Sequence, residues 1–258
     1  MSDYRTTPAA RYGQAAGVAV DQGLRSYMLT VYNYMAIGLA FTGLAAIGTY
    51  MLSVTTDPAQ AAATIKGGIM LTALGKALFT SWLAYVVIFA PLALVFFLSF
   101  RVQSMSVGAA QTMFWVYAAL VGVSLASVFL IYTHTSISRV FFITAAAFGG
   151  LSLYGYTTKR DLSPIGSFLI MGLIGIIIAS IVNIWLASSA LQFAVSVIGV
   201  IVFAGLTAWD TQRIKEMYFE GDDSLTAGRK AVMGALSLYL DFINLFMMLL
   251  QLFGARRD

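Results

Sequence analysis

The chain has 258 residues, of which 60% are hydrophobic and only 10% are charged. This composition is far more apolar than that of a soluble globular domain, so it predicts a protein that crosses a membrane several times. The net charge of +4 comes from Lys and Arg residues that are scattered singly, which argues against a nucleic-acid site. The absence of cysteine excludes disulfides, thiolate metal sites and cysteine catalysis.

Seven stretches of the chain are apolar over about the length that a helix needs to cross a bilayer. They cover approximately residues 27–52, 82–100, 106–132, 140–156, 164–187, 191–217 and 235–254. We therefore predict an all-α integral membrane protein. Its membrane domain is expected over residues 27–254, with an amino-terminal tail over residues 1–26 and a short carboxyl-terminal tail over residues 255–258.

The links between these stretches carry three further expectations. Residues 59–81 are interrupted by lysines and glycines, and we predict a loop there. His134 is expected in the short link before the fourth span. Ser163 is expected to cap a helix whose first residue is Pro164, where the missing amide hydrogen costs little.

The distribution of Lys and Arg predicts a cytoplasmic amino terminus. With seven spans in that orientation, ten of the fifteen basic residues lie on the cytoplasmic side. The remaining five are Lys66, Lys76, Arg139, Arg256 and Arg257. A six-span alternative, in which the final segment is re-entrant, places the last two of these inside. The compact loops and the lack of cysteine indicate a bacterial inner membrane.

Asp241 lies near the middle of the last apolar stretch, where an ionised carboxylate costs about 2.5–3.5 kcal/mol on insertion scales. An acid at this position is a candidate functional residue. On a helix, Ser237, Asp241, Asn244 and Gln251 share one face, because steps of three, four and seven residues return to a similar direction. We expect this polar stripe to face protein rather than lipid.

Asp210 is the second candidate, and it shares a polar face of the sixth stretch with Ser196, Thr207 and Thr211. At 1.5 Å per residue, both aspartates lie roughly 12–15 Å inside the same membrane edge. Consecutive antiparallel helices are usually neighbours, so the two carboxylates can meet. In a poorly solvated site such a pair is expected to share a proton and to titrate as a unit.

Arg101, at the end of the second span, is the candidate ion-pair partner of the aspartates once that proton is lost. Four further residues are candidate hydrogen-bond partners of the pair: Ser237, Asn244, Thr207 and Thr211. Purely structural alternatives stay open. Asp210 can extend toward water from its helix end, and Asp241 can hydrogen-bond to Ser or Tyr in a purely structural role. Arg101 can be an ordinary topological anchor.

Three segments carry a resemblance to a known family. They are KRDLSPIGSFL at residues 159–169, IGVIVFAGLTAWDTQRIK at residues 198–215 and ALSLYLDFINLFMMLLQLFG at residues 235–254. Together they resemble the Bax inhibitor-1 family, also called the transmembrane Bax inhibitor motif proteins. The resemblance covers the chain from the second span onward, whereas the amino-terminal third matches only in layout.

The resemblance implies a seven-helix fold with the last helix at the centre, and a pH-sensitive calcium leak across the membrane. It implies that Asp210 and Asp241 form the family's aspartate dyad, with Arg101 at or near the position of the arginine that pairs with it. The segment around Arg101 carries no close motif, so that assignment rests on its place in the chain. Calcium is then a transported ion near the dyad rather than a cofactor, and protons and the lipid bilayer are the other partners.

Other classes of membrane protein fit less well. A retinal protein needs a lysine in the last helix, and none lies between Ala231 and Gly254. An intramembrane serine protease needs a buried histidine, and the single histidine is expected in a link. The acidic link at residues 216–223 lacks the spacing of an EF-hand. We expect no enzymatic activity.

Two alternatives to a leak remain open at this stage. One is a proton-coupled cation transporter. The other is a non-conducting interaction protein that modulates a membrane-bound quality-control protease, a role that the family resemblance suggests for bacterial members. For this role, residues 1–24 offer a segment that a protease can grip. We expect a monomer.

Overall fold

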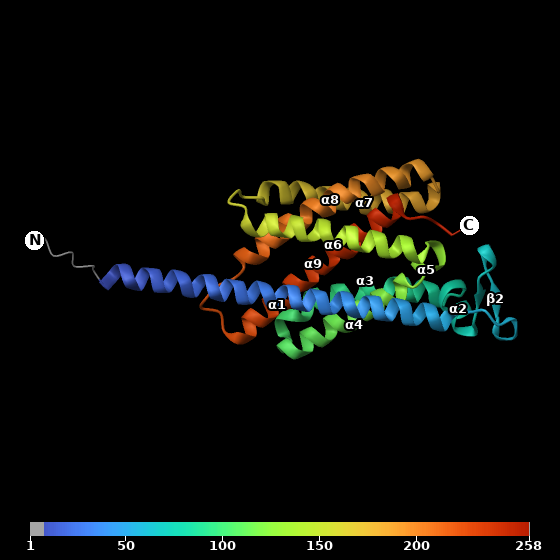
Figure 1. Ribbon diagram of the computed structural model, residues 1–258, viewed down its shortest axis with the longest axis horizontal. Helices are drawn as coiled ribbons and strands as arrows, with labels where there is room; N and C mark the ends of the chain where they lie inside the picture. Colours follow the sequence, from blue (N-terminus) through green and yellow to red (C-terminus); the bar gives the residue numbers. More distant parts are fainter. Residues whose placement is uncertain (1–7, 258) are drawn as a thin grey trace, which may run out of the picture.

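The computed structural model describes the backbone of residues 8–257 and the side chains of residues 22–65 and 67–257. Within that part of the chain, seven helices are long and apolar enough to cross a membrane, which confirms the predicted fold class. They lie side by side along the long axis of the molecule (Figure 1). The seven are α1 (Pro8–Ser53), α3 (Leu83–Arg101), α4 (Val107–Leu125), α6 (His134–Thr157), α7 (Ser163–Leu186), α8 (Ser189–Glu216) and α9 (Ser224–Phe253).

The last helix, α9, is the most buried of the seven. It runs obliquely through the middle of the bundle, where it packs against α1, α4, α6 and α8 (Figure 1). Buried residues such as Leu238, Tyr239 and Phe242 cover several sides of it. Small residues, among them Ala231, allow close packing with the neighbouring helices.

The helices at the outside of the bundle, α3 and α7, expose much of their apolar surface. Helix α7 packs mainly against α8, and α3 mainly against α4. Large side chains such as Phe168 and Ile184 on α7, and Ile88 and Phe100 on α3, are more than half exposed. In a membrane these surfaces face lipid, where their exposure carries no penalty.

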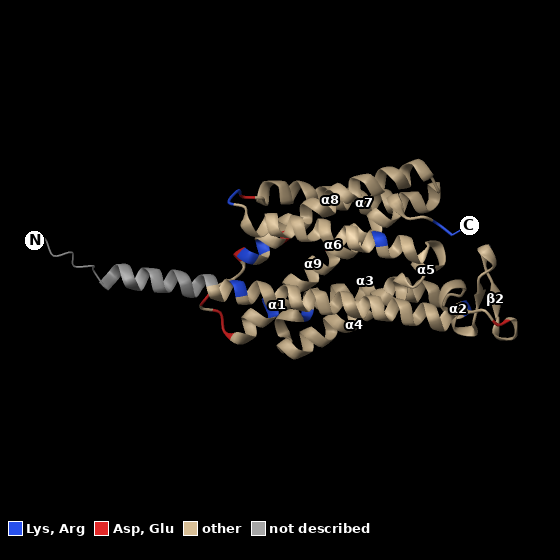
Figure 2. Ribbon diagram, viewed as in Figure 1, with Lys and Arg blue, Asp and Glu red and all other residues tan. Residues whose placement is uncertain are grey.

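All seven helices cross the bundle, so α1 begins at one end and α9 finishes at the other (Figure 1). This arrangement contradicts the six-span alternative with a re-entrant last segment. After α9 the chain is held at that end, since Ala255 O accepts from Thr133 N and Arg257 N donates to Ile131 O. Most Lys and Arg residues of the described part lie toward the two ends of the bundle (Figure 2).

The prediction of a plain loop over residues 59–81 is wrong. A small antiparallel sheet with the strand order β1-β3-β2 lies there, followed by a short helix, α2 (Ala73–Thr80). The strands are β1 (Val54–Thr55), β2 (Ala63–Thr64) and β3 (Met70–Leu71). A strand of two residues is too short to show the alternation of apolar and polar residues from which strands are predicted.

Four of the long helices begin with a side-chain cap in which an oxygen accepts a hydrogen bond from the backbone N–H three residues later. The capping residues are Ser106, Thr133, Ser188 and Asp223. The cap at Thr133 makes His134 the first residue of α6, so the placement of this histidine in a link is wrong. The third predicted span is also divided, into α4 and the short α5 (Val128–Ile131).

The predicted cap at Ser163 is also wrong. Ser163 is already helical, and its backbone N–H donates instead to Oδ1 of Asp161 at 2.8 Å. The preceding turn is held by Gln212 of α8, whose side chain accepts from Leu162 N and donates to Arg160 O, both at 2.8 Å. This contact comes from another helix, and local capping rules do not include it.

The hydrogen bonds from Ser163 lower the pKa of Asp161 below its ordinary value of 3.8. A carboxyl group whose pKa is lowered by folding stabilises the folded state when the pH is above the ordinary pKa of the group. This stabilisation is lost as the pH falls through the folded-state pKa. We therefore expect Asp161→Ala to unfold at a lower temperature than the parent at neutral pH, with the difference shrinking in acid. Thermal unfolding measured at both pH values tests this. The exposed Glu220→Ala is the control, for which we expect no difference.

Most side chains of the predicted amino-terminal tail, residues 1–26, lie outside the part of the chain that the structure describes. The structure assigns residues from Pro8 onward to α1, of which Gln22–Ser53 is the part suited to cross a membrane. The last helix likewise begins at Ser224, eleven residues before the apolar stretch from which it was predicted. Charged residues at the membrane edge continue these helices, so hydropathy alone places their ends too far inside.

Candidate functional site

The two candidate aspartates are brought together where α8 and α9 pack side by side. Asp241 on α9 is only 4% exposed, and the side chain of Asp210 on α8 is 14% exposed. Their carboxyl groups are close neighbours across the contact between α8 and α9. Among the described residues, Oδ2 of Asp241 is buried and has no hydrogen-bond partner. Two neighbouring carboxyl groups in a poorly solvated site cannot both ionise at low cost, so this arrangement suits a pair that shares a proton.

The nearest cation to the pair is Arg213, which the sequence analysis did not single out. Its Nη1 lies 3.9 Å from Oδ1 of Asp210, one helical turn away on α8. The Arg213 side chain is 58% exposed, and its guanidinium lies over the Trp209 ring, 5.3 Å from the ring centre. The spacing of three residues between Asp210 and Arg213 is the signal that would have found this contact.

Arg101 is placed differently from the aspartates. It is the last residue of α3 and is exposed. Within the part of the chain that the structure describes, it makes no ion pair with Asp210 or Asp241.

The four candidate hydrogen-bond partners lie on the helices that carry the pair, but none is seen to bond to either carboxyl within the described region. Asn244 donates to Leu240 O at 2.8 Å, and Thr207 donates to Phe203 O at 2.7 Å. Thr211 donates to the carbonyl of Thr207. These are bonds to the preceding turn of the same helix, a common way to satisfy a hydroxyl or amide inside a membrane helix.

A chain of hydroxyls, which the sequence analysis missed, connects three helices beside the pair. Tyr32 OH on α1 lies 2.6 Å from Ser152 Oγ on α6, which lies 2.9 Å from Thr211 Oγ1 on α8. Thr211 uses its only hydrogen toward Thr207 O, so Ser152 donates to Thr211 and Tyr32 donates to Ser152. The chain therefore ends at the residue that follows Asp210.

The opposite face of α9 is closed by Tyr239, which is fully buried two residues before Asp241. Its hydroxyl lies 2.7 Å from Thr42 Oγ1, which also donates to Ala118 O on α4 at 2.8 Å. The ring meets Phe114 edge-on, with the ring centres 5.6 Å apart. Aromatic packing and hydrogen bonding thus hold α9 against α1 and α4, while the carboxyl pair faces α8.

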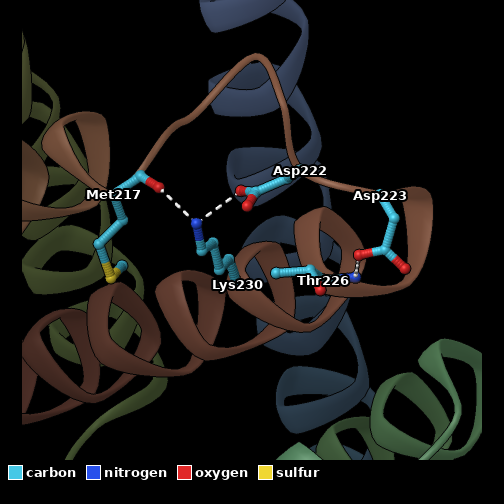
Figure 3. A network of polar contacts seen from close by, with 5 residues as sticks. All are labelled: Met217, Asp222, Asp223, Thr226 and Lys230. Atoms are coloured by element: carbon cyan, nitrogen blue, oxygen red, sulfur yellow. Dashed lines mark hydrogen bonds and ion pairs between the residues drawn. The ribbon is translucent and has the colours of Figure 1, made fainter.

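The loop between α8 and α9 is also held by hydrogen bonds, which Figure 3 shows. Lys230 Nζ donates to Met217 O at 3.0 Å and pairs with Asp222. Asp223 Oδ1 accepts from Thr226 N at 3.2 Å. These contacts tie the end of α8 to the first turns of α9 and hold the two helices that bear the pair side by side.

The site has few groups that could hold a resident metal ion. Across the described residues, no cluster of three or more His, Cys, Asp or Glu side chains is present. A stable calcium site uses about 6–8 oxygen ligands, whereas this pair supplies two carboxyls. The pair suits a proton or a briefly held cation better than a permanently bound one.

Comparisons with known proteins agree with the segments around the pair. The profile of a family described as "Inhibitor of apoptosis-promoting Bax1" matches residues 24–258. Protein RP147 of Rickettsia prowazekii is 49% identical over 240 residues, which cover 92% of this chain and 93% of the relative. Inner membrane protein YbhL of Escherichia coli is 47% identical over 238 residues, 91% of this chain and 94% of YbhL. A Caulobacter vibrioides protein is 45% identical over 255 residues, 98% and 96% of the two chains.

Proposed function

The chain belongs to the Bax inhibitor-1 family, and on that premise we propose that it is a pH-sensitive calcium leak of the bacterial inner membrane. Asp210 and Asp241 form its gate. The observation that carries the proposal is the contact of two carboxyl groups between α8 and α9, inside the membrane-spanning part of the bundle.

Loss of the shared proton supplies the force that opens the gate. Two unit charges 4 Å apart repel by about 4 kcal/mol at an effective dielectric constant of 20. With Asp241 only 4% exposed, water screens this repulsion poorly. The repulsion is relieved when α8 and α9 separate or when a cation enters between the carboxylates. The protonated pair therefore belongs to the closed state, and flux is expected to rise with pH.

Calcium is the ion that this gate would admit. Ca²⁺ prefers oxygen ligands, and two ionised carboxylates attract a divalent cation more strongly than a monovalent one. A conducting path needs binding that is weak enough for the ion to leave, and two carboxyls without a third acid meet that condition. Arg213, already 3.9 Å from Asp210, is the cation nearest at hand to balance the ionised pair, and Arg101 is a second candidate.

The orientation and location belong to the same proposal. The amino terminus is cytoplasmic, because this places the larger group of Lys and Arg residues inside. The name of the relative YbhL, an inner membrane protein, supports the location.

The test is calcium movement into liposomes that hold the full chain, in matched acidic, neutral and alkaline buffers. We expect an imposed calcium gradient to dissipate faster as the pH rises. With equal calcium on both sides and an imposed proton gradient, we expect no accumulation. Empty liposomes are the control. Accumulation would identify a proton-coupled transporter, and a folded protein that moves no calcium at any pH would favour the interaction-protein alternative.

A further inference from the structure

A cavity of about 620 Å³ lies between α1 and α6, and neither Asp210 nor Asp241 lines it. Its walls are largely apolar and include Met28 and Met35 of α1 and Phe148 and Leu153 of α6. All of these belong to the parts of the two helices that are suited to cross a membrane. Leu153 is 63% exposed, so the cavity opens sideways toward the surrounding lipid. We call it the α1–α6 groove.

One end of the α1–α6 groove is positively charged. Arg25, an exposed residue, lines the groove at the end where α1 enters the membrane domain. Tyr156 lines the same end from α6, and Lys215 of α8 lies 5.4 Å over its ring. Lys215 Nζ also donates to Tyr156 O at 2.8 Å, which holds this second cation in place. The groove is thus an apolar channel with the cation Arg25 at its polar end, and Lys215, which does not line the groove, is held against Tyr156 at the same end.

From this arrangement we propose that the α1–α6 groove binds an anionic glycerophospholipid. One acyl chain fills the apolar channel, and the phosphate lies against Arg25. Basic pockets between membrane helices near the polar edge suit anionic headgroups. A peptide is a poorer occupant, because its backbone polar groups would need partners that these apolar walls do not supply.

The occupant of the groove would also touch the hydroxyl chain beside the carboxyl pair. Tyr32 and Ser152 line the groove, and Ser152 hydrogen-bonds to Thr211 on α8. The lipid proposal stands on the shape and charge of the groove and does not depend on calcium transport.

The experiment is native mass spectrometry of the full chain in detergent, titrated with phosphatidylglycerol or with phosphatidylcholine of the same acyl chains. We expect one phosphatidylglycerol to bind more tightly than phosphatidylcholine. Arg25→Gln is expected to reduce that preference roughly fivefold, the value of one basic residue near an anionic headgroup. Arg139→Gln, an exposed arginine on α6 that does not line the groove, is the charge control and is expected to leave the preference unchanged.

Two glycines on α6 give a matched test of the channel itself. A side chain at Gly149, which lines the groove, or at Gly150, which does not, meets nothing within 4 Å at its first carbon. Gly149→Leu is expected to weaken phosphatidylglycerol binding at least tenfold, while Gly150→Leu binds as the parent does. Equal binding of the two lipids by the parent, or unchanged binding by Gly149→Leu, would overturn the proposal. Equally tight binding of glycerol phosphate would show an anion site without a lipid channel.

Discussion

Liposomes that hold Asp241→Asn are expected to show calcium flux that stays low and no longer changes with pH. Asparagine has nearly the shape of aspartic acid, remains neutral, and can donate a hydrogen bond to Asp210 across the α8–α9 contact. It therefore imitates the protonated pair permanently. At alkaline pH we expect at least about a tenfold loss of flux relative to the parent, because the repulsion of about 4 kcal/mol between ionised partners is absent.

Asp210→Asn is expected to behave in the same way, and the double variant should add little to either single change, since the three variants remove one shared interaction. Glu220→Gln is the control, because Glu220 is an exposed acid in the loop between the same helices. The measurement is initial calcium flux against pH for variants with matched thermal stability. A parent-like pH profile in Asp241→Asn would show that the pair is structural and is not the gate.

The second large effect is expected at Gly155, where the backbones of α6 and α8 lie close together. A Cβ atom on Gly155 would lie 2.1 Å from the carbonyl oxygen of Ala208. This oxygen belongs to the backbone of α8, so it cannot move aside as a side-chain end could. Overpacking of this kind typically costs about 1–3 kcal/mol. We expect Gly155→Ala to lower stability by at least this amount and to separate Ser152 from Thr211.

Gly150→Ala provides the matched comparison on the same helix. Nothing lies within 4 Å of a Cβ atom there, so the change brings only the helix preference of alanine, a gain of up to about 1 kcal/mol. Denaturant unfolding in detergent measures both variants. If Gly155→Ala proved as stable as Gly150→Ala, the close contact of α6 with α8 would not exist in the membrane-embedded protein.

The membrane helices could be predicted from the sequence because their signal is local. A bilayer requires long apolar stretches, and each such stretch is visible without knowledge of its neighbours. The ends were less predictable. Helix α9 continues outward to Ser224 through charged residues, and α7 begins beside a turn that Gln212 holds from α8. Both ends depend on contacts that hydropathy does not record.

The meeting of Asp210 and Asp241 was predictable for a related reason. Depth in the membrane follows from counting residues, and consecutive helices joined by a short link are usually neighbours. The hydrogen bonds around the pair were not predictable. Tyr32 and Ser152 lie 120 positions apart in the chain, and the contact between Thr42 and Tyr239 joins residues 197 positions apart. No sequence period connects such residues.

By itself, the amino-acid sequence determined the seven spans, the burial of two acids at matching depth and the family to which the chain belongs. Only the tertiary structure decided which neighbours those acids have, placing Arg213 beside Asp210 while leaving Arg101 exposed at the end of α3. It also formed the groove between α1 and α6. The physical reason is that hydropathy reports how each residue interacts with its solvent, whereas partners and cavities depend on how separate helices pack against one another.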